Sequence, residues 1–241
     1  MPVQSTRRFV TGRTLFVTGT DTEIGKTRVA TALLRGLVAA GYTAVGYKPV
    51  ASGCHDSPDG LRNNDALALS AAGSPGFKYD EINPYALAPA IAPHIAAAEA
   101  GISIDPRILD AGHRALAART DWVIVEGAGG WHVPLDRNDD FASWVSAHRW
   151  PVLLVVGMRL GCVNHALLSA RAIAADTTAI GWIANILPPR QPRLDYNLAW
   201  LEHAMPVPCL DRVGLDPPAD HAIDVDRWIR AVARVPRSNP V

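Results

Sequence analysis

The sequence predicts a single α/β domain of three layers, in which a mainly parallel sheet is covered by helices on both faces. Short apolar runs that suit buried strands alternate with segments of helical periodicity along the chain. The chain has 241 residues, 49% of them hydrophobic, which is enough to bury one core and fits one large domain. No internal repeat or low-complexity linker divides it. We therefore expect residues 1–241 to form one domain, with residues 1–12 flexible.

The predicted elements follow one another in a regular order. Strands are expected at residues 14–17, 43–50, 122–126, 152–156, 180–187 and 207–210. Helices are expected after the first strand, at residues 65–72, from Asp105-Pro106 onward, and at residues 141–148, 163–175 and 194–204, with a proline-broken segment at 84–93. Because parallel strands share one carboxyl edge, where ligands collect in such sheets, the polar residues that follow these strands are expected to meet there.

The segment 14–27, TLFVTGTDTEIGKT, predicts a P-loop and hence a P-loop NTPase-like fold, because a strand, a glycine-bounded loop and a helix arrive in the required order. Successive backbone N–H groups and the helix dipole attract phosphate, Lys26 adds a mobile charge, and the Thr27 hydroxyl can hold Mg²⁺. Five residues separate Gly19 from Gly25, one more than in the common form, so the loop is a variant. A plain turn would not explain a lysine in the first helical turn, where a cation opposes the dipole.

Three further residues are expected near this loop. Lys48 and Glu126 each stand at the carboxyl end of a predicted strand, and Asp65 lies at the start of a predicted helix. Mg²⁺ prefers oxygen ligands, so Thr27, Asp65 and Glu126 could hold it together with nucleotide phosphates. Glu126 could instead be a solvated strand end. Asp65 could equally be a helix N-cap.

Composition limits the class of partner. The formal net charge is zero and the pI is about 7.1, which implies neither nucleic acid nor an anionic membrane as a partner. Three widely spaced cysteines suit a reducing cytoplasm, and the eight histidines show no metal-ligand spacing. No apolar stretch approaches the roughly 18 residues that span a bilayer. Only three of the 23 basic side chains are lysines, and two of these, Lys26 and Lys48, lie in candidate site segments.

Seven segments, in order across most of the chain, resemble the dethiobiotin synthetase family. They are GTDTEIGKT, GYKPVASG (46–53), GLRNNDALAL (60–69), PHIAA (93–97), DWVIVEGAGGW (121–131), PVLLVVGMRLGCVNHALL (151–168) and GWIAN (181–185). The resemblance implies an ATP- and Mg²⁺-dependent ligase of biotin biosynthesis. Such an enzyme carboxylates 7,8-diaminononanoate with CO₂ and closes the ureido ring of dethiobiotin, through a carbamate and a carbamic-phosphoric anhydride, releasing ADP and phosphate.

The same resemblance implies a role for each matching residue. The catalytic groups would be Lys48, Lys26 and Thr22. The nucleotide would contact Thr20, Asp21, Glu23, Ile24, Gly25, Lys26, Thr27, Arg28, Asn185 and Pro188. The metal would be held by Thr27, Asp65 and Glu126. The diamine or carbamate would contact Thr22, Lys48, Ser52 and Gly129. Each of the less specific positions has a plainer alternative: Glu23 suits a helix N-terminus, Ser52 suits a turn, and Gly129 belongs to a glycine run that could be a flexible connection.

A second anion site is expected where the helix near residue 163 begins. In the family this segment grips the distant substrate carboxylate from the partner subunit of a homodimer. The residues here are Arg159, Leu160, Gly161, Cys162 and Asn164, with arginine where lysine is more familiar. An ordinary helix cap is an equally good interpretation of the residues alone.

The C-terminal part leaves a rival function open. Val225, Trp228, Ile229 and Val232 have helical spacing, with arginines alongside. A basic amphipathic helix of this kind binds membranes in some nucleotide-switched P-loop ATPases of the partition and cell-division positioning type. We favour a helix docked on its own core, because acids come first and arginines last, which matches the helix dipole. Residues 205–218 lack the family's usual glycine-glutamate turn, so the base contacts there stay undetermined.

Overall fold

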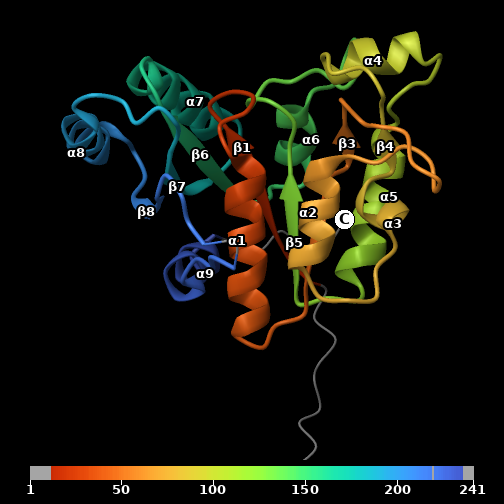
Figure 1. Cartoon of the computed structure of the whole chain (residues 1–241), viewed down its shortest axis with the longest axis horizontal. Helices are drawn as coiled ribbons and strands as arrows, with labels where there is room; N and C mark the ends of the chain where they lie inside the picture. The colour runs from red at the N-terminus through yellow and green to blue at the C-terminus, as the bar shows by residue number, and fades with distance from the viewer. Residues whose placement is uncertain (1–11, 219, 236–241) are drawn as a thin grey trace, which may run out of the picture.

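The computed structural model describes residues 12–218 and 220–235, and its centre is a six-stranded sheet in the order β2-β5-β1-β6-β7-β8 (Figure 1). All of the pairings in this sheet are parallel. The strands are β1 Arg13–Gly19, β2 Ala44–Tyr47, β5 Trp122–Glu126, β6 Val152–Met158, β7 Ala179–Ile186 and β8 Cys209–Val213. The predicted α/β class is therefore confirmed. Of residues 1–12, for which flexibility was expected, residues 1–11 lie outside the described residues, and the N–H of Gly12 donates to the carbonyl of Ala117 at 2.8 Å.

Helices cover both faces of the sheet, as the sequence predicts. They are α1 Lys26–Ala39, α2 Asn64–Ala72, α3 Tyr79–Ile82, α4 Pro93–Glu99, α5 Pro106–Ala117, α6 Phe141–Ala147, α7 Cys162–Asp176, α8 Leu194–Ala204 and α9 Val225–Ala233. Side chains alternate along each strand, so Leu15 and Val17 pack under α1 and α9 while Phe16 packs on the opposite face under α6. Two apolar cores result, one on each side of the sheet, and the strand ends are held rigidly between them.

The predicted strand at residues 43–50 is divided in the structure. β2 ends at Tyr47, and Val50–Ala51 forms β3, which pairs with β4, Tyr85–Ala86, in a separate two-stranded sheet. Pro49 has no N–H to continue the ladder of the main sheet, which accounts for the break. β3, β4, α3 and α4 were not predicted, because each is too short to show a periodic pattern.

The C-terminal helix α9 is docked on the body of the protein. Its Trp228 ring meets Trp122 of β5 edge to face, with 4.9 Å between centroids. Just before α9, the N–H of Ile223 donates to the carbonyl of Ala32 in α1 at 3.1 Å. The two segments approach so closely at Gly36 that a Cβ on this residue would lie 2.3 Å from the carbonyl oxygen of Ile223. The interpretation of a docked helix is thus correct for its apolar face. Among the described residues, no helix is both long and apolar enough to span a bilayer.

Candidate active site

The P-loop connects β1 to α1 and is shaped by one glycine that no other residue can replace. Gly25 has φ 87°, in the left-handed region, and a Cβ there would lie 2.0 Å from Nδ2 of Asn185. In the loop, the Lys26 ammonium donates to the carbonyl of Asp21 at 2.8 Å. Burial, and next the positive charge of Lys48, lower the pKa of Lys26 to about 8. The chain is therefore folded around a phosphate-sized turn that holds its lysine in place.

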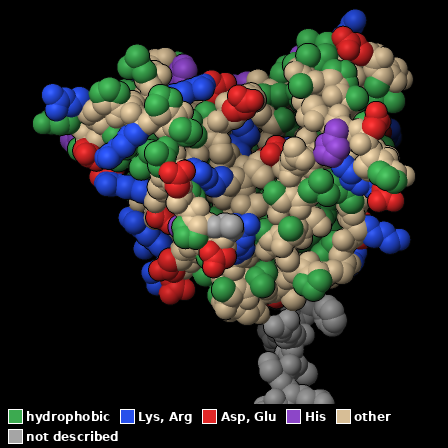
Figure 2. Space-filling model, in the orientation of Figure 1, with side chains coloured by type: hydrophobic (Ala, Val, Ile, Leu, Met, Phe, Trp, Pro, Cys, Tyr) green, Lys and Arg blue, Asp and Glu red, His purple; other side chains and the backbone are tan. Residues whose placement is uncertain are grey.

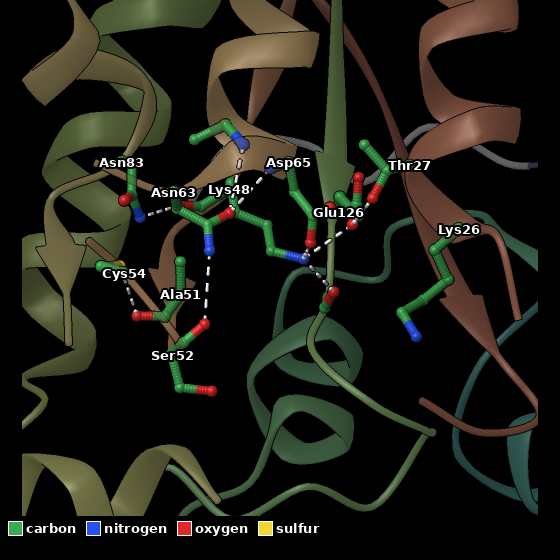
Figure 3. Close-up of polar contacts among 12 residues, drawn as sticks. Lys26, Thr27, Lys48, Ala51, Ser52, Cys54, Asn63, Asp65, Asn83 and Glu126 are labelled. Carbon is green, nitrogen blue, oxygen red and sulfur yellow. Dashed lines mark hydrogen bonds and ion pairs between the residues drawn. The ribbon is translucent and has the colours of Figure 1, made fainter. Parts of the chain in front are cut away.

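Beside the P-loop, four elements bring their polar side chains into one cluster, in which Lys48 and Glu126 are buried and Asp65 and Thr27 are partly exposed (Figure 3). The Lys48 ammonium, just beyond β2, lies 2.6 Å from Oε1 of Glu126 at the end of β5 and 3.3 Å from Oδ2 of Asp65 in α2. It also donates to the carbonyl of Gly127 at 3.1 Å. The Thr27 hydroxyl in α1 donates to the same Oε1 of Glu126 at 2.8 Å. The parallel strands thus place these residues at one edge, as the sequence analysis expected.

Charges in this cluster stabilise one another. Burial alone would lower the pKa of Lys48, which is 4% exposed, but the attraction of Glu126 and Asp65 outweighs burial and raises this pKa. Burial would likewise raise the pKa of Asp65, but Lys48 outweighs it, so that pKa is lowered. The Lys48 ammonium and the Asp65 carboxylate therefore both stay charged near neutral pH.

Two alternatives from the sequence are decided by the geometry. Glu126 is not a solvated strand end, because it is 0% exposed. Asp65 is not the N-cap of α2, because the Asn63 side chain holds that place and accepts from the N–H groups of Asp65 and Ala66. Both carboxylates are thus left facing Lys48.

The donor set fits a Mg²⁺ ion that nucleotide phosphates complete. Oε2 of Glu126 is buried and has no hydrogen-bond partner within the described part of the chain. Carboxylate and hydroxyl oxygens, here from Glu126, Asp65 and Thr27, are the protein ligands that Mg²⁺ takes beside substrate phosphates. The described residues contain no group of three or more His, Cys, Asp or Glu that could hold a metal alone. Phosphate oxygens are therefore needed for such a site.

At the opposite end of the P-loop, a second group of contacts joins α1 to β7 and to the chain after β8. Nδ2 of Asn185 donates to the carbonyl of Ile24 at 2.7 Å, and the Asn185 side chain is fully buried. The Arg28 guanidinium donates to Oδ1 of Asn185 at 3.3 Å and to the carbonyls of Gly214 and Leu215 at 3.2 and 2.9 Å. The structure thus brings together Arg28 and Asn185, two residues that the resemblance assigns to the nucleotide.

The segment before α7 also approaches the P-loop. Arg159 forms an ion pair with Asp21, and Leu160 next to it is 93% exposed. Gly161 occupies the N-cap of α7 with φ 93°, and Cys162 is buried. This projecting turn therefore touches the P-loop on one side and solvent on the other.

The chain matches the AAA domain family over residues 13–222. It is 52% identical to the ATP-dependent dethiobiotin synthetase BioD of Pseudomonas paraeruginosa over 200 residues, covering 82% of this chain and 88% of the relative. It is 50% identical to the protein of the same name from Xanthomonas oryzae pv. oryzae over 208 residues, covering 86% and 93%. The chain belongs to the ATP-dependent dethiobiotin synthetase family. The resemblance seen in the sequence, and the interpretation as an ATP-dependent ligase that forms C–N bonds, are confirmed.

Solved structures show the same P-loop fold outside the dethiobiotin synthetases. The septum site-determining protein MinD of Pyrococcus horikoshii, complexed with Mg-ADP, matches with a TM-score of 0.55 and 15% identity, covering 92% of this chain and 86% of that one. A ParA family ATPase from Chlorobium tepidum matches with a TM-score of 0.52 and 14% identity, covering 92% and 90%. At such identities the likeness concerns the fold alone.

The remaining residues expected from the dethiobiotin synthetase resemblance lie around the cluster. Thr22 is exposed on the P-loop, and its hydroxyl would be 3.5 Å from a Cβ at Gly129, so these two face one another. The carbonyl of Ser52 accepts from Nδ2 of Asn63 at 3.3 Å, beside the start of α2. Glu23 is exposed and has φ 56°. The Thr20 hydroxyl accepts from the N–H of Gly157 at 3.4 Å.

The sequence analysis did not identify the residues whose hydrogen bonds hold the backbone around Lys48. Asn63, Tyr79 and Asn83 form a hydrogen-bonded chain behind Lys48, yet nothing in their spacing sets them apart. Asn63 alone carried a usable signal, because asparagine immediately before a helical pattern predicts an N-cap.

Proposed function

We propose that the chain is an ATP- and Mg²⁺-dependent dethiobiotin synthetase that carboxylates 7,8-diaminononanoate with CO₂ and closes the ureido ring. Dethiobiotin, ADP and phosphate are the products, within biotin biosynthesis. The observation that carries the proposal is the contact of Lys48 with Glu126 and of Glu126 with Thr27 of the P-loop. It supports a site in which the γ-phosphate end of ATP and the reacting amines meet at one buried lysine.

The reaction proceeds in three steps on the substrate. One amine of the diamine attacks CO₂ and loses a proton, which forms a carbamate. A carbamate oxygen attacks the γ-phosphorus of ATP, the bond to ADP breaks, and a carbamic-phosphoric anhydride results. The second amine then attacks the carbonyl carbon and loses a proton, phosphate leaves with the bridging oxygen, and the ring closes. Negative charge accumulates next to phosphate in each step.

Two lysines supply the positive charge that these steps need. Lys48 stays protonated because Glu126 and Asp65 raise its pKa, so it can stabilise the carbamate and the transferring phosphoryl group without moving. Lys26, held by the carbonyl of Asp21 in the free protein, is close enough to the P-loop turn to exchange that carbonyl for phosphate oxygens. Catalysis here is positioning and preorganised electrostatics, with Thr22 placed to orient the carbamate.

Thr27, Asp65 and Glu126 would hold the Mg²⁺. When bound, Mg²⁺ neutralises charge on the phosphates. In the free protein Lys48 occupies one oxygen of Glu126, and the other oxygen, Oε2, is left for the metal. The Glu126 carboxylate can therefore bind the Lys48 ammonium through one oxygen and Mg²⁺ through the other.

The ends of both substrates have their own expected contacts. Asn185 would bind adenine by exchanging its contacts with Ile24 and Arg28 for the base, Pro188 would also contact the nucleotide, and residues 20–28 would surround the phosphates. The distant carboxylate of the diamine would bind the segment from Arg159 to Asn164 of the partner subunit in a homodimer. The exposed position of Leu160 and the amide groups at the start of α7 support that contact. The cytoplasmic location stays a prediction.

The rival function, a nucleotide-switched ATPase of the partition or cell-division positioning type, has less support. MinD and ParA share the fold at 14–15% identity, whereas the named dethiobiotin synthetases share about half of the sequence. The apolar side of α9, through which such a protein could bind a membrane, packs on Trp122 here. The P-loop also lacks a second lysine near its start.

Incubation with ATP, Mg²⁺, bicarbonate and 7,8-diaminononanoate tests the proposal. Mass spectrometry should detect dethiobiotin, and one phosphate should be released per ring formed. ATP turnover that lipid vesicles stimulate and the diamine does not affect would favour the switch protein instead.

A further inference from the structure

A chain of buried and partly buried hydrogen bonds holds the backbone of Lys48. Asn83, which is 2% exposed, donates through Nδ2 to the carbonyl of Lys48 at 2.7 Å (Figure 3). The same Nδ2 donates to the carbonyl of Tyr85 at 3.1 Å. Its Oδ1 accepts from the Tyr79 hydroxyl at 2.9 Å. The same hydroxyl accepts from the N–H of Asn63 at 2.7 Å. Tyr79 therefore joins the residue behind Lys48 to the residue that caps α2.

The other end of this chain fixes Asp65. Oδ1 of Asn63 accepts from the N–H of Asp65 at 3.0 Å and from that of Ala66 at 3.3 Å, which sets the first turn of α2. The N–H of Lys48, in turn, donates to the carbonyl of Ile82 at 2.9 Å. Lys48 is thus held by Ile82 and Asn83. Asp65 is held by Asn63, which is itself bonded to Tyr79 of α3.

The main sheet does not fix Lys48 by itself. β2 ends at Tyr47, and Pro49 carries no N–H, so the ladder stops beside the lysine. The Asn83 amide uses both of its donors and one acceptor position, which leaves it a single orientation in a buried site. A lysine on a flexible four-carbon stem needs such a fixed base to keep its ammonium in one place.

We propose that Tyr79 and Asn83 are positioning residues, which set the separation between the Lys48 backbone and α2 and so hold the Lys48 ammonium against Asp65 and Glu126. The inference rests on the proposed function, because only there does Lys48 act on reacting groups. A displacement of about 1 Å in such a group can cost around a hundredfold in rate. A purely structural hydrogen bond would change stability and leave the reaction of the folded protein unaltered.

Tyr79→Phe removes the joining hydroxyl and keeps the ring, over which the Arg62 guanidinium lies 4.2 Å from the centroid. Tyr85→Phe is the matched control, because it also removes one partly buried tyrosine hydroxyl, which accepts from the N–H of Asp105 at 2.9 Å. Both variants should lose similar thermal stability. Only Tyr79→Phe should lower kcat for dethiobiotin formation, by about tenfold, with the KM for ATP changed less than about twofold.

A second readout needs no substrate. The chain contains only three lysines, Lys26, Lys48 and Lys78, so ¹³C labelling of the lysine ε-carbon gives three NMR signals, assigned with Lys78→Arg and Lys26→Arg. At fixed pH the Lys48 signal should shift and sharpen in Tyr79→Phe and stay unchanged in Tyr85→Phe. An unchanged Lys48 signal in Tyr79→Phe, or equal effects of both variants on the signal or on kcat, would overturn the positioning role. Failure of the wild type to make dethiobiotin would instead overturn the proposed function, while the NMR comparison still decides the positioning role.

Discussion

The phosphate end and the base end of the proposed nucleotide site are built in different ways. At the phosphate end, the buried side chains of Lys48 and Glu126 lie 2.6 Å apart and form an ion pair. At the base end, the Arg28 guanidinium donates to the carbonyls of Gly214 and Leu215, in the chain that follows β8. Figure 2 shows many basic side chains on the side of the molecule formed by α8, β8 and α9. Preassembly at the phosphate end suits chemistry, because preorganised charges need no rearrangement in the transition state. We therefore expect the base end to contribute to ATP affinity more than to the rate of reaction.

Lys48→Ala should have the largest effect. We expect kcat for dethiobiotin formation to fall about 10³-fold, because one preorganised cation next to the reacting oxygen is lost. ATP binding, measured by calorimetry, should change little. Lys48→Met keeps the apolar stem of the side chain and controls for lost packing. If ATP binding and ring closure fell equally in both variants, Lys48 would be an ATP-binding residue and not one that acts on the reacting groups.

Glu126→Gln should act through the metal. The amide keeps the shape of the side chain but removes its charge, so the Mg²⁺ concentration for half-maximal activity should rise about 10- to 100-fold. Glu202→Gln, at an exposed glutamate paired with Arg212, is the control and should leave the Mg²⁺ dependence unchanged. A Mg²⁺ titration of Glu126→Gln that overlays the wild type would exclude Glu126 as a ligand.

Lys26 should make ATP binding depend on pH. Its pKa of about 8 in the free protein means that the ammonium loses its proton as the pH rises through 8. The protonated form binds phosphate, so the Kd for ATP should increase above pH 8, by up to about tenfold per pH unit. Lys26→Arg keeps its charge throughout this range and should show a flat profile. The same slope in both proteins would mean that another group titrates.

Arg28→Ala should have the smallest effect. It removes three hydrogen bonds that join α1 to Asn185 and to the chain after β8, so the KM for ATP should rise a few-fold to about tenfold with kcat retained. Arg35→Ala, on the same helix, loses one long bond to the carbonyl of His221 and serves as control. A fall in kcat for Arg28→Ala that matches Lys48→Ala would remove the distinction between the two ends.

The sequence predicted which residues meet beside the P-loop, but it did not predict the contacts of Arg28 with the chain after β8, for a physical reason. Lys48 and Glu126 could be placed because strand periodicity shows where parallel strands end, and those ends share one edge. The contact of Arg28 with Gly214 and Leu215 could not, because it joins residues 186 and 187 positions apart through backbone carbonyls that any sequence supplies.

The hydrogen bonds of Tyr79 and Asn83 behind Lys48 also could not be predicted from the sequence. Tyr79 and Asn83 lie in and after a four-residue helix, too short to show a period. Their partners, Asn63 and Lys48, are 16 and 35 residues away. The broad fold follows from repeated local patterns, whereas these contacts are single long-range hydrogen bonds between polar groups.

The central claim is that the site around Lys48 joins the γ-phosphate of ATP to a carbamate. It is tested most directly by following a carbamate oxygen that comes from CO₂. The protein is mixed with ATP, Mg²⁺, 7,8-diaminononanoate and freshly prepared ¹⁸O-labelled CO₂, and the released phosphate is analysed by mass spectrometry. We predict one ¹⁸O in each phosphate, because the carbamate oxygen that attacks phosphorus leaves with it at ring closure. Phosphate that carries only oxygen from ATP and water would contradict the account.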